Sequence, residues 1–313
     1  MENGEYVEFQ NPYRLEYLPK NADSAYYWER VDRNIGWITK EEQEILRKSV
    51  VGIAGCGGMG GLIASILLRV GVGEIRIADS ETFDATNINR QFAAKRSTVG
   101  KSKAMATVEE LRSITDDTKI VVYPKGGICP ETVEHFVSGC DVILDEIEFF
   151  VVPARILLHQ VARRHGVSLF NCNTVGFGTR LFLFNPESVP IEDILGLSLS
   201  EATSLLLTAK SSSYPDQKRQ AVLKIAKIMM ENLVPELPEY RRGDHDMAWG
   251  SLLKGRAPII GTNPPMASGF LSDRVLFHLL RNSGVQRDIL ETPTAPSYLY
   301  FDAGKMEAKL VWR

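Results

Sequence analysis

The sequence has 313 residues, of which 44% are hydrophobic and 24% charged, a composition that predicts a soluble globular protein and argues against disorder. Its formal net charge of -3 gives no general attraction to nucleic acid, which is therefore disfavoured as a partner. The N-terminus lacks the pattern of a secretory signal, and no apolar run reaches membrane-spanning length, so we expect a cytoplasmic protein.

Residues 1–48 are predicted to form an N-terminal arm that ends in a surface helix, where Ile45 and Leu46 lie among charged residues. The β-branched run at residues 50–55 then predicts a strand that is terminated by glycines. The apolar stretch at residues 59–72 predicts a helix directly after it. The main domain therefore begins with a strand, a tight turn and a helix.

Strands and helices continue to alternate up to residue 186. Strands are predicted at residues 74–79, 119–123, 141–145 and 167–172, and helices at residues 101–114 and 153–166. Such alternation is typical of an α/β protein with a Rossmann-like, doubly wound and mostly parallel sheet. We interpret residues 49–186 as one domain of this kind.

The pattern changes in residues 187–313, which we expect to form a crossover and substrate-binding segment and to complete the same domain. A strand near residue 179 alternates as in an antiparallel extension of the sheet. A polar helical stretch follows from residue 191 to about residue 234, and then a loop in which His245 is interpreted as exposed, with acid–base work as the alternative. The predicted closing elements are a buried helix at 266–282 and strands at 297–302 and 308–313.

Four glycines, Gly55, Gly57, Gly58 and Gly60, lie in the sequence GCGGMG between the first predicted strand and its helix. In this context a glycine-rich turn lets main-chain N–H groups and a helix N-terminus approach a phosphate group. By itself the motif indicates a nucleotide site. A tight turn without any ligand is the alternative.

Three side chains that follow the turn refine this prediction. Asp79 ends the second strand, about 20 residues on, where a carboxylate can accept hydrogen bonds from ribose hydroxyls, although helix capping is an equal alternative. Arg90 and Lys103 come next, and for either cation alone a surface role is the commoner interpretation. Together they favour ATP over a nicotinamide dinucleotide, because attack at the α-phosphate needs cations along the triphosphate.

These elements, taken in order, resemble the ThiF, MoeB and HesA family, the bacterial relatives of ubiquitin-activating E1 enzymes. The matching motifs are GxGGxG, the acidic residue Asp79, N-x-x-R-Q ending at Gln91, and G-x-x-K ending at Lys103. The resemblance covers about residues 30–186 and returns weakly at residues 265–281. It implies a Rossmann-like adenylation domain that binds ATP at residues 49–186.

The family resemblance also implies which residues surround ATP. They are the four glycines of the turn with Asp79, Asn87, Arg90, Gln91 and Lys103. In the family, an arginine from the arm of the other subunit completes the site, which implies a homodimer. Arg33 in the sequence RVDRN is the candidate for this arginine, although a glutamine of the family pattern is replaced by Asn34 and a surface arginine is the alternative.

The chain departs from the family where a magnesium ligand is expected. The family has D-x-x-D-N after its fourth strand, and the second Asp helps to hold Mg²⁺. The corresponding residues here are DEIEF at 145–149, so Glu148 replaces that Asp and the Asn is missing. A carboxylate on a longer side chain still suits Mg²⁺, and Asp145 or Glu146 is the alternative ligand.

A second departure concerns cysteine chemistry. Family members that transfer the acyl group to sulfur carry a Cys in the crossover region, and many carry two CxxC pairs for zinc. This chain has only Cys56, Cys129, Cys140 and Cys172, without a CxxC pair. We therefore expect no enzyme thioester, and we interpret Cys172 as a small core residue.

The predicted function is ATP-dependent adenylation of a carboxylate or amide on a peptide or small protein, followed by direct attack on the adenylate. In lacking a transfer Cys the chain is similar to the peptide-antibiotic maturation enzymes of the microcin C7 and pantocin type. Activation of a sulfur-carrier protein and dehydration of tRNA threonylcarbamoyladenosine are alternatives within the family. An NAD-dependent oxidoreductase and a non-catalytic scaffold are alternatives from other classes.

Overall fold

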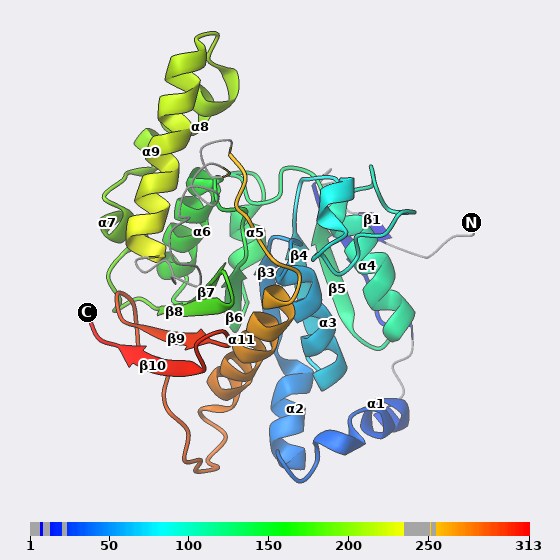
Figure 1. Ribbon diagram of the computed structural model, residues 1–313. Helices are drawn as coiled ribbons and strands as arrows, with labels where there is room; N and C mark the ends of the chain where they lie inside the picture. Colours follow the sequence, from blue (N-terminus) through cyan, green and yellow to red (C-terminus); the bar gives the residue numbers. More distant parts are fainter. Residues whose placement is uncertain (1–6, 9–12, 21–23, 235–250, 252–254) are drawn as a thin grey trace.

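The computed structural model describes residues 7–8, 13–20, 24–234, 251 and 255–313. The described strands form one ten-stranded sheet in the order β1-β2-β5-β4-β3-β6-β7-β8-β9-β10 (Figure 1). The strands are β1 (Val7–Glu8), β2 (Leu15–Tyr17), β3 (Val50–Ala54), β4 (Glu74–Ala78), β5 (Lys119–Tyr123), β6 (Val142–Asp145), β7 (Ser168–Val175), β8 (Gly178–Phe184), β9 (Tyr298–Asp302) and β10 (Glu307–Val311).

The centre of the sheet is parallel, and its two margins are antiparallel. Strands β5, β4, β3, β6 and β7 pair in parallel, as apolar strands buried on both faces do. Strands β8, β9 and β10 continue the sheet in antiparallel pairs beyond β7. The prediction of a Rossmann-like, mostly parallel sheet with an antiparallel C-terminal extension is confirmed.

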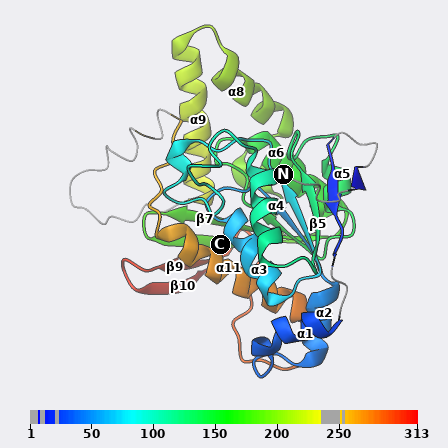
Figure 2. The ribbon, with the colours of Figure 1, turned by 90° about the vertical axis from the view of Figure 1, so that its right-hand side faces the viewer.

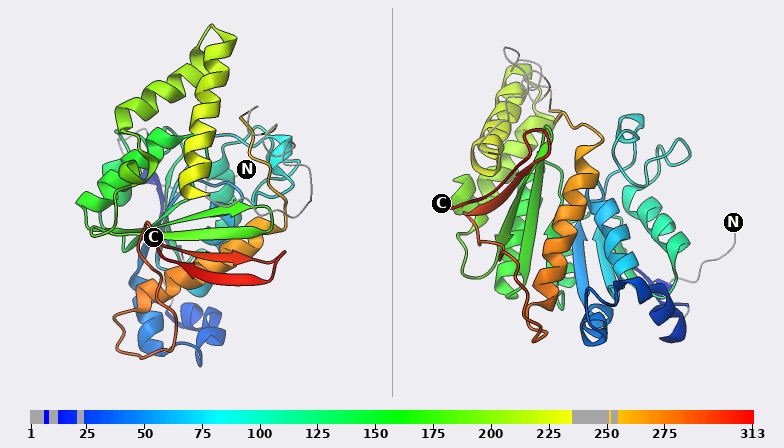
Figure 3. Two further views of the ribbon diagram at one scale, coloured as in Figure 1. Left: turned by 60° about the vertical axis from the view of Figure 1, so that its left-hand side comes forward. Right: turned by 60° about the horizontal axis from the view of Figure 1, so that its bottom comes forward.

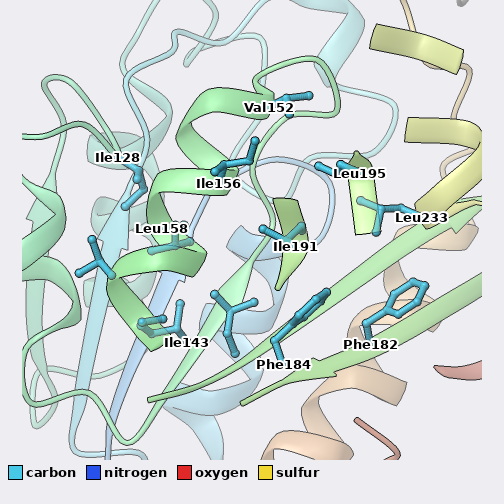
Figure 4. Close-up of a cluster of buried hydrophobic side chains, with 14 of the residues drawn as sticks. Ile128, Ile143, Val152, Ile156, Leu158, Phe182, Phe184, Ile191, Leu195 and Leu233 are labelled. Atoms are coloured by element: carbon cyan, nitrogen blue, oxygen red, sulfur yellow. The ribbon is translucent and has the colours of Figure 1, made fainter. Parts of the chain in front are cut away.

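Helices cover both faces of the sheet, so the protein has three layers (Figure 3). One face packs against α2 (Lys40–Lys48), α3 (Gly60–Val70), α4 (Lys103–Ile114) and α11 (Asn263–Leu280). The other packs against α5 (Val133–Val137), α6 (Val152–Arg164), α7 (Ile191–Leu195), α8 (Leu199–Ser211) and α9 (Pro215–Leu233). Figure 4 shows Ile156 and Leu158 of α6 and Phe184 of β8 among the buried side chains of this core. Within the part of the chain that the structure describes, no helix is long and apolar enough to cross a membrane.

Five features were not predicted from the sequence. The arm contains two helices, α1 (Ser24–Arg30) and α2, separated by a 3₁₀ turn at Asp32–Asn34. The helical stretch after residue 191 is three helices: Gly196 ends α7 with a positive φ of 59°, and a second break separates the end of α8 at Ser211 from the start of α9 at Pro215. Helices α8 and α9 project from the body as a hairpin (Figure 2). Helix α5 and the pairing of β2 with β5 were also missed.

The strand order reverses at the carboxyl ends of β3 and β6, and we call this switch point the crevice, as is usual for open α/β sheets. These two strands are neighbours, yet the chain leaves β3 toward β4 and leaves β6 toward β7, on opposite sides. The helices that follow them, α3 and α6, consequently cover opposite faces of the sheet. Ligands of open α/β sheets bind at such a point, where the strand order reverses.

Candidate active site

The glycine-rich turn lies at this crevice, and two of its glycines are required by close main-chain packing. Gly55 follows β3 with a φ of 104°, and a Cβ atom there would lie 2.1 Å from the carbonyl oxygen of Glu146. A Cβ atom at Gly60 would lie 1.9 Å from the carbonyl oxygen of Gly55. The turn can therefore bring α3 close to β3 only with glycine at both positions.

The other two glycines border open space or a neighbouring segment. Among the described residues, none except its two chain neighbours has an atom within 4 Å of the position that a Cβ would take at Gly57, whereas at Gly58 the Pro264 side chain is 3.2 Å away. Met59, the N-cap of α3, makes no side-chain hydrogen bond to the first turn of the helix. The N–H groups of that turn, which the Met59 side chain does not cap, can therefore donate to an anion.

Asp79 lies directly after β4 and joins the turn to the segment that follows. Its Oδ2 accepts a hydrogen bond of 2.7 Å from the Cys56 amide, and its Oδ1 accepts one of 2.8 Å from the Glu81 amide. Burial raises the pKa of Asp79, and the two amides partly offset this effect. Asp79 is buried, with 9% of its surface exposed.

The N-x-x-R-Q segment begins at Asn87, the last residue of a short 3₁₀ helix at Ala85–Asn87, and continues as a turn. Asn87 is buried, and its Oδ1 accepts from the Asp84 amide, so it shapes this loop. Arg90 Cγ lies 3.7 Å from the position of a Cβ at Gly58, which places the Arg90 side chain beside the glycine-rich turn. The buried Nε of Arg90 and Oε1 of Gln91 have no hydrogen-bond partner among the described residues.

Lys103 is the first residue of α4, and its side chain turns toward the same crevice. Its Nζ lies 2.7 Å from Oε2 of Glu81, and its amide donates to the Glu81 carbonyl at 2.9 Å. The Lys103 side chain is 9% exposed, whereas that of Glu81 is 49% exposed. Hydrogen bonds thus connect the glycine-rich turn, Asp79, Glu81 and Lys103 in one continuous chain.

Asp145 ends β6 and is enclosed in an ion-pair cluster. Its Oδ2 lies 2.7 Å from Nε of Arg155 and 2.9 Å from Nε2 of His159, and its Oδ1 accepts from the Ile147 amide at 3.2 Å. Burial would raise the pKa of Asp145, but Arg155 and His159 outweigh it and lower that pKa. Both carboxylate oxygens are engaged, which argues against Asp145 as a metal ligand.

Glu148 lies in the loop between β6 and α6. Its Oε2 accepts a hydrogen bond of 2.7 Å from the Phe150 amide. Desolvation raises the pKa of Glu148, and the negative charge of Glu81 adds to this effect. The Phe150 amide, Arg155 and Lys103 oppose it. Glu148 therefore shares one electrostatic environment with Glu81 and Lys103.

Arg33 lies apart from these residues. It is exposed in the 3₁₀ turn of the arm, which precedes α2 and the amino end of β3. The arm lies at the end of the molecule opposite the loop between β4 and α4 (Figure 1). Arg33 consequently does not join the site of its own chain.

Three of the four cysteines are buried, and their positions bear on the predicted chemistry. Burial raises the pKa of Cys56 and Cys172 above the ordinary range and that of Cys140 to about 12. Cys172 packs in the core, as predicted, with Sγ 2.9 Å from Oγ1 of Thr179. Cys129 is half-buried in a turn, and His245 lies outside the described residues.

The ThiF family profile matches residues 31–310, which is most of the chain. The chain belongs to the ThiF family of E1-like, ATP-dependent adenylyltransferases. The match includes the glycine-rich turn, Asp79, the N-x-x-R-Q segment and Lys103. The family resemblance seen in the sequence is confirmed.

Curated relatives of this ThiF chain have several different activities. The chain is 37% identical over 114 residues to a tRNA threonylcarbamoyladenosine dehydratase of Bacillus subtilis, covering 36% of this chain and 44% of the relative. It is 31% identical over 129 residues to the SAMP-activating enzyme E1 of Haloferax volcanii, covering 41% and 47%. It is 26% identical over 145 residues to the mouse adenylyltransferase and sulfurtransferase MOCS3, covering 46% and 31%. The chain thus spans less than half the length of these three relatives.

Solved structures resemble the ThiF chain over nearly all of its length. PaaA superposes with a TM-score of 0.61 at 15% identity, covering 93% of this chain and 75% of PaaA. Escherichia coli MccB crystallised with ATP superposes with a TM-score of 0.58 at 15% identity, covering 94% of this chain and 73% of MccB. At such identities the likeness establishes the fold.

Sequence reasoning missed several residues that form the walls of the site. Glu81 lies two residues after Asp79, and no sequence motif indicated a role for it. In the structure, the bridge between Thr82 and Ser102 places its carboxylate beside Lys103. Pro264 reaches Gly58 from the start of α11. Such contacts between distant segments leave no local sequence pattern.

Proposed function

We propose that the chain adenylates a carboxylate or amide of a peptide or small protein with ATP, forming an acyl-adenylate and pyrophosphate. The observation that carries this proposal is the convergence of Gly57, Asp79, Arg90 and Lys103 at one end of the parallel strands. Asp79 contacts the glycine-rich turn through Cys56, Arg90 lies beside Gly58, and Lys103 is joined to Asp79 through Glu81.

The residues at the crevice fit ATP. Gly57 leaves space for a phosphate to approach the main chain, and the first turn of α3 offers N–H donors. Asp79 accepts hydrogen bonds at the end of β4, where a ribose hydroxyl is expected. The unpartnered Nε of Arg90 and Oε1 of Gln91 have hydrogen-bonding capacity that a bound nucleotide can satisfy.

The same region fits a magnesium ion less completely. Glu148 is the carboxylate at the position where the family pattern D-x-x-D-N has its second Asp. Mg²⁺ is often held by one or two carboxylates together with substrate phosphates and water. Among the described residues, no cluster of three or more acidic, His or Cys side chains exists that could hold a metal by itself. We propose Glu148 as the protein ligand, where the ion would neutralise phosphate charge.

In the proposed reaction, a substrate carboxylate oxygen attacks the α-phosphorus of ATP. The bond between the α-phosphorus and the bridging oxygen breaks, and pyrophosphate leaves with the electron pair. Arg90 and Lys103 stabilise the charge that grows on the departing group, and the main-chain amides of the turn orient the phosphates. A second nucleophile then attacks the acyl carbon and displaces AMP.

We propose that this second nucleophile comes from the substrate or from another protein. The buried thiols at Cys56, Cys140 and Cys172 have raised pKa values, which disfavours the reactive thiolate. All four cysteines precede the crossover segment at residues 187–313. An enzyme thioester in that segment is therefore not available to the chain.

Two features support a peptide or small protein as the substrate. The solved structures that resemble this chain include MccB in complex with MccA variants. The net charge of -3 also makes general electrostatic attraction to RNA weak. We retain tRNA as the second candidate substrate, because this chain is 37% identical over 114 residues to the tRNA threonylcarbamoyladenosine dehydratase of Bacillus subtilis.

We further propose a homodimer in which Arg33 enters the site of the partner. The exposed position of Arg33 on the arm, away from the crevice of its own chain, supports contact with a second chain. An arginine placed at the triphosphate would add a further cation to Arg90 and Lys103.

Exchange of labelled pyrophosphate into ATP tests the proposal. The purified chain is incubated with peptides and small proteins encoded beside its gene, and separately with tRNA. We expect label in ATP only when an acyl substrate is present, with a loss of about a hundredfold in Lys103→Ala. Lys101→Ala, an exposed lysine in the preceding loop, is the matched control and should retain activity. ATP binding without exchange by any of these substrates would favour the scaffold interpretation.

A further inference from the structure

Lys103 has a carboxylate partner in a position that a phosphate group also needs. Its Nζ is 2.7 Å from Oε2 of Glu81. The lysine side chain is 9% exposed and the glutamate side chain 49% exposed, so the carboxylate lies on the solvent side of the ammonium group. A nucleotide that enters the crevice from solvent therefore meets Glu81 before it reaches Lys103.

The main chain around Glu81 is held firmly next to α4. The Lys103 amide donates to the Glu81 carbonyl at 2.9 Å, and a bridge pairs Thr82 with Ser102. The Glu81 amide in turn donates to Oδ1 of Asp79 at 2.8 Å. By contrast, among the described residues the Glu81 carboxylate forms an ion pair with Lys103 alone. The side chain can therefore rotate away while its main chain stays in place.

Charge decides which partner Lys103 prefers when a nucleotide is present. A partly exposed ion pair of this type is weak, because solvent screens it. Hydrogen bonds from an ammonium group to phosphate oxygens are charge-assisted and strengthen where water is excluded. A carboxylate left beside a triphosphate also repels it. Glu81 and the nucleotide consequently compete for the same cation.

We propose that Glu81 is the counter-ion of Lys103 in the nucleotide-free enzyme, and that ATP binding exchanges its carboxylate for a phosphate oxygen. Glu81 is thus a positioning residue that keeps the Lys103 ammonium group at the crevice and lowers the affinity for nucleotide. This inference rests on the proposed function, because it requires ATP at this site.

Isothermal titration calorimetry with ATP tests the exchange directly. The full chain and its Glu81→Gln variant are compared in EDTA and again in Mg²⁺, and thermal melting verifies folding. Glu81→Gln should bind ATP about three- to fivefold more tightly in EDTA, and less than about twofold more tightly in Mg²⁺. Glu81→Asp, with a shorter reach to Lys103, should give an intermediate change in EDTA.

Two controls separate the counter-ion role from simple charge removal. Glu110, on the same helix α4, forms a surface ion pair with Lys95. Glu110→Gln removes that carboxylate and should leave the affinity for ATP unchanged. In a Lys103→Met background, Glu81→Gln should change the affinity by less than about twofold, because no ammonium group is released.

Three results would overturn the inference. If Glu81→Gln increased the affinity for ATP equally in the wild-type and Lys103→Met backgrounds, Glu81 would act only by repelling phosphate. Weaker binding by Glu81→Gln in Mg²⁺ would make Glu81 a metal ligand instead. If Glu81→Gln and the wild type bound ATP equally tightly in EDTA, the proposed exchange would be refuted, whereas the proposed function would stand. A wild type that does not bind ATP would refute the proposed function itself.

Discussion

Oδ2 of Asp79 accepts a hydrogen bond of 2.7 Å from the main-chain amide of Cys56, and this contact joins the end of β4 to the glycine-rich turn after β3. The other carboxylate oxygen accepts from Glu81, which pairs with Lys103. One carboxylate therefore positions both the main chain and the cation that we assign to the phosphates.

Asp79→Ala should weaken ATP binding by at least about tenfold, because it removes the proposed ribose acceptor and frees the Cys56 amide. Calorimetric titration with ATP measures the change. Asp288→Ala is a suitable control, since Asp288 is exposed in the loop after α11, far along the chain from the crevice. Nearly equal affinities in Asp79→Ala and Asp288→Ala would place the nucleotide elsewhere.

Two glycine substitutions should separate folding from nucleotide binding. Gly60→Ala should destabilise the protein by about 3 kcal/mol or more, because its Cβ would lie 1.9 Å from the Gly55 carbonyl oxygen. Gly57→Ala should melt near the wild-type temperature, since the described residues beyond its chain neighbours leave its Cβ position open to 4 Å, yet bind ATP about tenfold more weakly. Thermal melting and calorimetry on both variants test this split. An unchanged ATP affinity in Gly57→Ala would show that phosphate does not approach this turn.

The proposed trans contact of Arg33 predicts complementation between two inactive variants. Mixing Arg33→Ala with Lys103→Ala should restore part of the pyrophosphate exchange, because a hybrid dimer has one site with both cations intact. Subunit exchange is verified with differently tagged chains, and size-exclusion chromatography with light scattering gives the oligomeric state. No recovery in demonstrated hybrids, or a monomeric wild type, would contradict the trans role of Arg33.

Replacement of the cysteines should leave catalysis within about tenfold of wild type, equivalent to about 1.4 kcal/mol in the barrier. Cys56, Cys129, Cys140 and Cys172 are changed to Ala or Ser singly and then together. Loss of packing at the three buried positions accounts for a reduction of this size. Pyrophosphate exchange and product formation are both measured. A single replacement that abolishes product formation but spares exchange would reveal a covalent thioester step.

A buried ion pair between the arm and the segment after α11 predicts a specific loss of stability in acid. Glu42 is fully buried and accepts hydrogen bonds from Arg287, from the Thr39 amide and from Ser283. The Arg287 guanidinium is the largest influence that lowers the pKa of Glu42, to about 2. Because the folded pKa is depressed, this stabilisation is present above the ordinary pKa of 4.5 and is lost as the pH falls toward 2.

We expect this pair to contribute about 3 kcal/mol to the free energy of unfolding at neutral pH. Denaturant titrations between pH 7 and pH 2 should show the loss in the wild type, and Glu42→Gln should lack this component. Arg287→Gln should raise the pKa of Glu42 and remove the larger part of this pH dependence, because Arg287 is the largest influence that lowers that pKa. Identical pH profiles in the wild type and Glu42→Gln would contradict the assignment.

Much of the architecture was determined by the sequence alone. The β-branched and apolar runs predicted β3, β4, β5 and β6 within one residue of their observed bounds, because strands buried on both faces need continuous apolar side chains; β7 extends three residues beyond its predicted end. The order of GxGGxG, Asp79, N-x-x-R-Q and Lys103 predicted the family and the residues at the crevice. Both signals are local, since each depends on residues a few positions apart.

Only the tertiary structure decided how these residues are partnered. Asp145 was a candidate metal ligand until α6 brought Arg155 and His159 to its carboxylate. Glu81 gained a role because the chain between β4 and α4 folds back on itself and places its carboxylate beside Lys103. The charge and hydrogen bonds of a side chain depend on segments that are far away in the sequence. Motif spacing could therefore predict which residues lie at the crevice, but not which partners their side chains have there.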